Sequence, residues 1–271
     1  MKPTRRHVVT GGAALALGAC ASHRPLMASA PKTFLLIHGT WHGGWVWTWV
    51  REILQARGHR VFTPTLTGCG EREHLSSPEV GLDTHIRDIV NVIDFEGLED
   101  VIISAHSFSG TAMTGAVDRR RDKIRHVNFF DAVVPRPGRM SAVERTESGE
   151  LTPEFKRRVP GFIDGYKMDL FADYPFRMLM PEDHPKAEWV RARITTHPAK
   201  AWKDELVLEN GGWEGLPRSY FHAVGQVFAP TSDKMIGPAR GPGWDFRELD
   251  VARNGMVTHP QVVADALESL G

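Results

Sequence analysis

The residues of this chain that are best suited to chemistry lie in the stretch SAHSFSG, from Ser104 to Gly110. Ser107 stands there between an apolar run, DVIISAH, and a helical pattern, SGTAMTGAV. A sharp turn from a strand into a helix exposes a serine hydroxyl as a nucleophile, and it needs small neighbours, which Ala105 and Ser109 provide. The motif therefore predicts a nucleophilic serine, with a simple helix cap as the alternative interpretation.

A second glycine-rich stretch, HGTWHGGW at 38–45, follows the apolar run FLLI. A loop in that place supplies a backbone N–H, here from Thr40, which acts with the N–H of Phe108 on a developing negative charge. Four aromatic side chains next to these two motifs are expected to line the substrate site, although core packing also explains some of the tryptophans. They are His38, Trp41, Trp45 and His106.

These two motifs need a sheet to position them, and the pattern from residue 32 onward predicts one. Short apolar runs alternate with helical periodicity, which is typical of a mostly parallel sheet covered by helices, an α/β fold of the doubly wound kind. The predicted strands are 34–39, 59–65, 100–107, 125–134, 219–225 and 246–251. The predicted helices are 49–58, 83–97, 109–120 and 259–270.

The segment 135–216 interrupts this alternation. It is rich in proline, charge and isolated aromatic residues, and it offers helical fragments such as PKAEWVRARITTH without strand signals. We interpret it as a cap inserted between two parts of one sheet domain, 31–134 and 217–271. Such a cap would cover the carboxyl ends of the strands, where open α/β sheets bind ligands.

Five stretches make the chain resemble the α/β-hydrolase superfamily, in the branch of hydroxynitrile lyases, plant methylesterases and bacterial pyrethroid- and carbamate-type esterases. They are FLLIHGTWHGGWVW, GHRVFTPTLTGCGEREHL, GLDTHIRDIVNVI, ISAHSFSG and NFFDAVVP. The resemblance implies a nucleophile at Ser107, oxyanion donors at Thr40 and Phe108, a pocket shaped by the cap, and no cofactor. It predicts hydrolysis of a small, largely apolar ester- or amide-like substrate.

This sequence departs from the family pattern at the two positions where the family has the catalytic acid and the catalytic histidine. Laid onto SYFHAVGQVF it places Gln226 at the acid position, and laid onto FRELDVARNGMVTHP it places Arg253 at the histidine position. An amide carries no charge, and an arginine side chain donates hydrogen bonds but does not accept a proton. The sequence therefore predicts a non-standard site, with Arg253 and Gln226 among the substrate-binding residues.

Three hypotheses follow for this site. In the first, His259 is the base and Asp131, at the end of a predicted strand, is the acid. In the second, Arg253 and the oxyanion donors bind a carboxylate or enolate in a lyase, isomerase or cyclase, unless Arg253 is a surface cation paired with Glu248 or Asp250. In the third, the protein binds a small molecule without turnover.

Composition narrows the choice of partners. Lys plus Arg number 33 and Asp plus Glu number 33, so the formal net charge is zero and nothing favours nucleic acid. No phosphate-binding glycine loop or cluster of metal ligands is evident, so no cofactor or metal is expected. A small-molecule substrate is the expected partner, and the sequence leaves the oligomeric state open.

The first thirty residues predict export. Lys2, Arg5 and Arg6 precede a short apolar stretch, which resembles a twin-arginine signal. The tetrapeptide at 17–20 resembles a lipobox, in which Cys20 becomes the lipidated first residue, with cleavage near 28–30 as the alternative. Lipidation would tether the protein to a membrane facing the periplasm. Only Cys69 would remain as an unmodified cysteine, so no intramolecular disulfide is expected.

Overall fold

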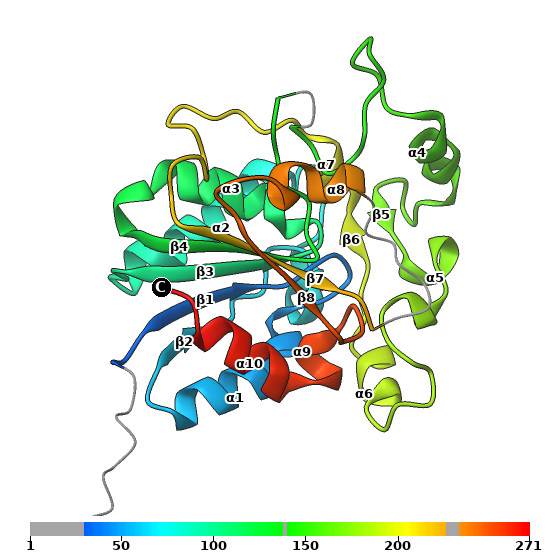
Figure 1. Cartoon of the computed structure of the whole chain (residues 1–271). Helices are drawn as coiled ribbons and strands as arrows, with labels where there is room; N and C mark the ends of the chain where they lie inside the picture. The colour runs from blue at the N-terminus through cyan, green and yellow to red at the C-terminus, as the bar shows by residue number, and fades with distance from the viewer. Residues whose placement is uncertain (1–29, 138–139, 226–232) are drawn as a thin grey trace, which may run out of the picture. The chain divides into compact units, whose positions relative to one another are not determined.

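The structure is a computed structural model that describes residues 30–137, 140–225 and 233–271. Residues 31–271 form one compact unit around a six-stranded sheet (Figure 1). Every pairing in this sheet is parallel, and the strand order is β2-β1-β3-β4-β7-β8. The strands are β1 (Thr33–Ile37), β2 (Arg60–Phe62), β3 (Val101–His106), β4 (Ile124–Phe130), β7 (Arg218–Ala223) and β8 (Asp245–Leu249). All six lie where the sequence predicted strands.

Helices cover both faces of the sheet, as the apolar character of the central strands requires. Along β1, Leu35 and Ile37 contribute to the core beneath one pair of helices, α2 (Leu82–Phe95) and α3 (Ser109–Arg119). Phe34 and Leu36 point to the other face, beneath α1 (Thr48–Ala56), α9 (Gly255–Thr258) and α10 (Pro260–Glu268). Two separate apolar cores therefore lie on the two sides of the sheet, and Figure 1 shows helices on both of these sides.

The segment between β4 and β7 has little regular structure. It contains the short helices α4 (Pro153–Arg158), α5 (Leu170–Asp173), α6 (Ala187–Arg191) and α7 (Ala199–Lys203), and it lies beyond the ends of the parallel strands (Figure 1). Two strands of two residues each, β5 (Lys167–Met168) and β6 (His197–Pro198), pair there antiparallel. The sequence of this segment shows no strand signal, because this pair is too short to leave an alternating pattern. Helix α8 (Asp233–Ile236) lies between β7 and β8.

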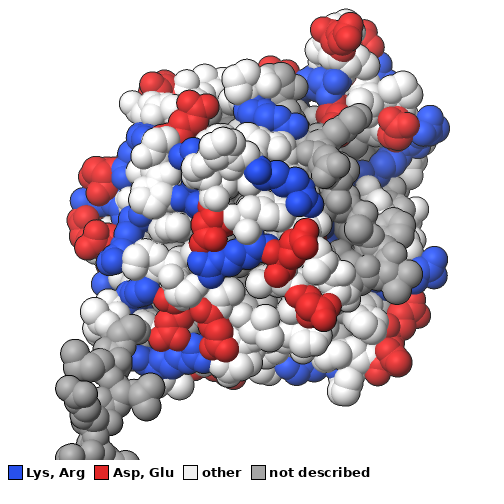
Figure 2. All heavy atoms as spheres, in the orientation of Figure 1, with Lys and Arg blue, Asp and Glu red and all other residues white. Residues whose placement is uncertain are grey.

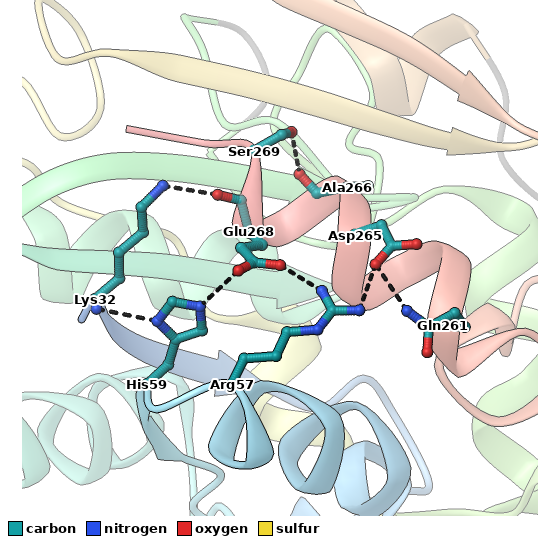
Figure 3. A network of polar contacts seen from close by, with 8 residues as sticks. All are labelled: Lys32, Arg57, His59, Gln261, Asp265, Ala266, Glu268 and Ser269. Carbon is teal, nitrogen blue, oxygen red and sulfur yellow. Dashed lines mark hydrogen bonds and ion pairs between the residues drawn. The ribbon is translucent and has the colours of Figure 1, made fainter. Parts of the chain in front are cut away.

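The last helix is joined to the first by a polar network around Glu268 (Figure 3). The Glu268 carboxylate accepts from His59 Nε2 at 3.0 Å and from Arg57, which also pairs with Asp265 at 2.6 Å. Lys32, just before β1, donates to the carbonyl oxygens of Glu268 and Leu270 at 2.7 Å each. These contacts hold α10 against α1 and so fix the chain that follows β8.

Charges of both signs are interspersed on the face of the molecule in Figure 2, in keeping with the zero net charge. Among the described residues, no helix combines the length and the apolar character needed to span a bilayer.

Candidate active site

Ser107 lies at the turn between β3 and α3. Its φ is 60°, in the left-handed region that residues other than glycine rarely adopt, so the turn holds strain. The turn is stabilised from β4: the Ser107 N–H donates to Phe130 O at 3.2 Å, and Val133 N–H donates to Ser107 O at 3.0 Å. The hydroxyl is thereby presented at the carboxyl edge of the sheet.

The loop after β1 packs closely against this turn. A Cβ on Gly39 would lie 2.8 Å from His106 Nδ1 and 2.9 Å from Ser107 Cβ, so only glycine fits there. Ser109, a small residue of the motif, donates from its hydroxyl to His38 O. Ser109 thus ties the start of α3 to the loop that carries Thr40.

The two residues predicted to supply oxyanion donors border a cavity beside Ser107. Thr40 and Phe108 both line it, and within the described part of the chain neither backbone N–H has a hydrogen-bond acceptor. Phe108 caps α3, whose first turn leaves N–H groups unpaired and carries the positive end of the helix dipole. Trp202 Nε1 in α7 donates to Thr40 Oγ1 at 3.0 Å, so the cap contacts this loop directly. The role of the two N–H groups as oxyanion donors stays a prediction.

Arg253 lies beside Ser107. It follows β8 in the loop before α9, is 5% exposed, and donates from Nη2 to Ser107 Oγ at 2.8 Å. Its Nη1 lies 2.5 Å from Oδ2 of Asp131, a fully buried carboxylate directly after β4. Asp131 Oδ1 in turn lies 3.0 Å from His222 Nδ1. The alternative of Arg253 as a surface cation paired with Glu248 or Asp250 is therefore wrong.

His259 is not brought to Ser107. Its ring is exposed, its Nδ1 contacts the neighbouring Thr258 Oγ1 at 2.9 Å, and it does not line the cavity. The reason is that α9 occupies the stretch between Arg253 and His259, so the loop does not rearrange as the first hypothesis required. Asp131 lies at the site, but its partner there is Arg253 rather than His259.

Two other histidines near the site have both ring nitrogens engaged. His42 Nδ1 donates to Thr40 O at 2.7 Å, and its Nε2 accepts from Asn254 at 3.0 Å. His38 Nδ1 donates to Gly39 O at 2.8 Å, and its Nε2 accepts from Leu66 N–H at 3.0 Å. Burial lowers the pKa of His38 to about 3 and that of His42 to about 4. Both rings are neutral anchors of the loop, and His38 does not line the cavity.

The cavity over Ser107 has a volume of about 590 Å³, within the range of small-molecule sites. Its walls are largely apolar and come from both the sheet domain and the cap. The aromatic lining residues are Trp41, Phe108, Phe155, Tyr174 and Trp202. Arg158 of the cap also lines it, with its guanidinium 5.2–5.5 Å from the rings of Phe155, Tyr174 and Trp202.

Two predicted binding residues fall elsewhere. Trp45 does not line the cavity; its ring packs against Trp189 and His42, each at 5.3 Å between centroids. Gln226 lies outside the described residues. No group of three His, Cys, Asp or Glu side chains within the described ranges is arranged to hold a metal ion, and Cys69 is buried without a disulfide.

Sequence reasoning missed several residues of the site. His42 lines the cavity. Its position in the quoted HGTWHGGW motif, beside the predicted oxyanion donor Thr40, could have identified it as a site residue. His222, within the predicted strand 219–225, was not among the predicted site residues, because its contact with Asp131 depends on the register of β4 and β7. The cap residues Tyr174 and Trp202 carry no local signal, because irregular chain brings them to the cavity.

Comparison with known proteins finds a matching family model and a similar esterase. A family model described as the alpha/beta hydrolase family matches residues 34–266. The chain is similar to a carbendazim-hydrolysing esterase from Nocardioides sp. (strain SG-4G), with 34% identity over 248 residues, covering 88% of this chain and 99% of the relative.

Among solved structures, an extracellular alpha/beta-hydrolase from a Paenibacillus species has a TM-score of 0.71 at 22% identity, covering 89% of this chain and 99% of the other. A pyrethroid hydrolase from Sphingobium faniae JZ-2 has a TM-score of 0.66, also at 22% identity, covering 88% and 96%. At these identities the two structures support the fold alone.

Proposed function

The chain belongs to the alpha/beta hydrolase family, and from that membership we propose that it is a serine-type esterase that hydrolyses a small, largely apolar ester- or amide-like substrate. The observation that carries the proposal is the position of Ser107. It lines a cavity of about 590 Å³ together with Thr40 and Phe108, whose backbone N–H groups have no acceptor among the described residues. That arrangement suits attack on a carbonyl carbon with the oxygen held by two donors.

The similarity to a carbendazim-hydrolysing esterase supports the same class of reaction. The apolar and aromatic walls favour a substrate with an aromatic or aliphatic body. Burial of such an apolar group against these walls contributes binding free energy, and the group needs no hydrogen-bond partner in the cavity. The ester carbonyl would lie at the floor, beside Ser107. Arg253 would then lie next to the reacting atoms as a fixed positive charge.

The test uses a fluorophosphonate, which labels an activated serine, together with p-nitrophenyl esters of short acyl chains. Wild-type protein should gain the mass of one label and hydrolyse the esters, and Ser107→Ala should lose both activities. Ser148→Ala, an exposed serine of the cap, is the matched control and should behave as wild type. Labelling that persists in Ser107→Ala would refute the proposal.

A second reaction class is favoured by one specific contact. The guanidinium of Arg253 donates to Ser107 Oγ, where a hydrolase of this family would have a base. A fixed cation beside two N–H donors also suits an enolate or carboxylate in lyase or isomerase chemistry. Absence of ester hydrolysis, together with tight binding of an anionic carbonyl compound that Arg253→Met abolishes, would favour this second class over hydrolysis.

Export is a further part of the proposal and rests on the sequence alone, since residues 1–29 lie outside the described residues. We propose that the twin-arginine-like signal directs the protein to the periplasm, with Cys20 lipidated. The intact mass of the mature protein distinguishes a lipidated N-terminus at Cys20 from simple cleavage near residue 30.

A further inference from the structure

His106 is an anomaly among the buried histidines near the site. It is 1% exposed, and neither ring nitrogen has a hydrogen-bond partner within the described residues. The rings of His38 and His42, in the same region, each use both nitrogens. A buried polar group without a partner costs about 1–3 kcal/mol, so a ring left in this condition calls for an explanation.

The ring lies beside the nucleophile. His106 is the last residue of β3, immediately before Ser107, and it lines the cavity. Gly39 packs against both side chains at once, with its hypothetical Cβ 2.8 Å from His106 Nδ1 and 2.9 Å from Ser107 Cβ. The imidazole and the serine side chain therefore border the same small space.

Four candidate groups, Arg253, His42, His259 and Asp131, are poor acceptors for the serine proton. Arg253 Nη2 donates to Ser107 Oγ and does not accept. His42 already accepts from Asn254 and donates to Thr40 O. His259 is exposed and remote from the cavity lining. Both oxygens of Asp131 are engaged, one by Arg253 and one by His222.

Resting on the proposed esterase function, we propose that His106 is the catalytic base that takes the proton of Ser107. The proton moves from Oγ to a ring nitrogen while Oγ bonds to the ester carbonyl carbon, and the carbonyl oxygen becomes an anion held by the N–H groups of Thr40 and Phe108. When the bond to the leaving oxygen breaks, the imidazolium returns the proton to that oxygen. Water then gives a proton to His106 while its oxygen bonds to the acyl carbon. When the bond between that carbon and Ser107 Oγ breaks, His106 returns the proton to Oγ, which frees the acid and restores Ser107.

The electrostatics agree with this geometry. Burial, and then the charge of Arg253, hold the pKa of His106 well below its ordinary value, so its ring is neutral near pH 7. A neutral imidazole with so low a pKa is a weak base. Donation from Arg253 Nη2 to Ser107 Oγ compensates, because it stabilises negative charge on that oxygen.

The experiment compares His106→Phe and His106→Ala with a matched control, His126→Phe. His126 is also a buried histidine, but it lies in β4 away from the cavity, with Nε2 3.0 Å from Ser219 Oγ. His106→Phe should lower kcat for ester hydrolysis and the fluorophosphonate labelling rate about 10²–10⁴-fold, with the melting temperature unchanged or raised. His126→Phe should lower the melting temperature and leave both rates within twofold.

Added imidazole supplies the readout that a structural role would not move. It should restore labelling of His106→Ala in a concentration-dependent way, and it should not affect Ser107→Ala. His106→Phe with rates within tenfold of wild type, or no rescue of His106→Ala, would overturn the role of His106 while leaving the esterase proposal intact. A wild type that neither labels nor hydrolyses esters would overturn both.

Discussion

At the scale of single residues, the site differs from a standard serine hydrolase by the exchange of an imidazole for a guanidinium. Arg253 is held by a carboxylate, as a catalytic histidine would be, with Asp131 Oδ2 at 2.5 Å. It contacts the serine, as that histidine would, at 2.8 Å. A guanidinium in this place orients Ser107 and stabilises negative charge, but it does not remove a proton. The carboxylate needed behind a base is therefore already present.

This arrangement predicts a gain of function from Arg253→His. An imidazole at this position would have Asp131 behind it and Ser107 in front, so fluorophosphonate labelling should accelerate by about tenfold or more. In an Asp131→Asn background the gain should disappear, because the ring loses the carboxylate that orients it. Arg253→Lys, which keeps the charge without a base, serves as control. A labelling rate for Arg253→His at or below that of wild type contradicts the prediction.

Most of these site residues could be predicted from the sequence, some from a strong local motif and others from a weaker alignment. Ser107 and Thr40 stand in local motifs, and Arg253 was placed by two anchors, Met256 and Pro260, in a short loop. His259 was misplaced because a linear pattern does not reveal that a helical turn, α9, separates it from the site. The unpartnered state of His106 was equally invisible, since it depends on every atom packed around the ring.

At the scale of elements, the tight packing of α3 against the chain after β4 fixes the nucleophile. Gly110 is the point of closest approach: a Cβ there would lie 2.1 Å from Val133 O and 3.1 Å from a ring carbon of Phe129. Val133 also donates its N–H to Ser107 O. Helix α3 and the turn at Ser107 are therefore held by the same backbone segment.

Gly110→Ala should accordingly damage both stability and activity. A backbone oxygen cannot move aside cheaply, so α3 would have to shift, and overpacking of this kind costs about 1–3 kcal/mol. We expect the melting temperature to fall by about 2–4 °C per kcal/mol and the labelling rate to fall with it. Gly161→Ala, where a Cβ meets nothing within 4 Å, is the control. Equal melting temperatures for the two variants would refute the argument.

The elements themselves were predictable to different degrees. The six strands were predicted from short apolar runs, and the helices α1, α2, α3 and α10 from apolar residues at helical spacing. All residues of β3, VIISAH, are buried, and its apolar start, Val101 to Ile103, made it recognisable as a central strand. The cap was predicted only as irregular, because its helices of four to six residues are held by contacts with the rest of the molecule rather than by their own pattern.

At the scale of the whole molecule, the formal charges balance, but the buried histidines make the free energy of unfolding sensitive to acid. Positive and negative residues are equal in number and mixed on the surface in Figure 2. Histidines, by contrast, are gathered in the interior, where burial lowers their pKa values. The group comprises His38, His42, His85, His106, His126 and His197. Protonation of each of these rings is therefore less favourable in the folded state than in the unfolded chain.

The free energy of unfolding should therefore fall as soon as the pH drops below about 6.5, the ordinary histidine pKa that these groups have in the unfolded chain. Folded-state pKa values of about 3 for His38 and about 4 for His42 and His126 mean that the unfolded chain binds protons first. The stabilisation is fully present above pH 6.5 and is lost progressively towards pH 4, by up to about 1.4 kcal/mol per pH unit for each group. Urea unfolding at pH 7.5, 6.5, 5.5 and 4.5 measures this slope, and His126→Phe should reduce it by one proton. A free energy of unfolding that stays constant between pH 7.5 and 5 would contradict the burial of neutral histidines.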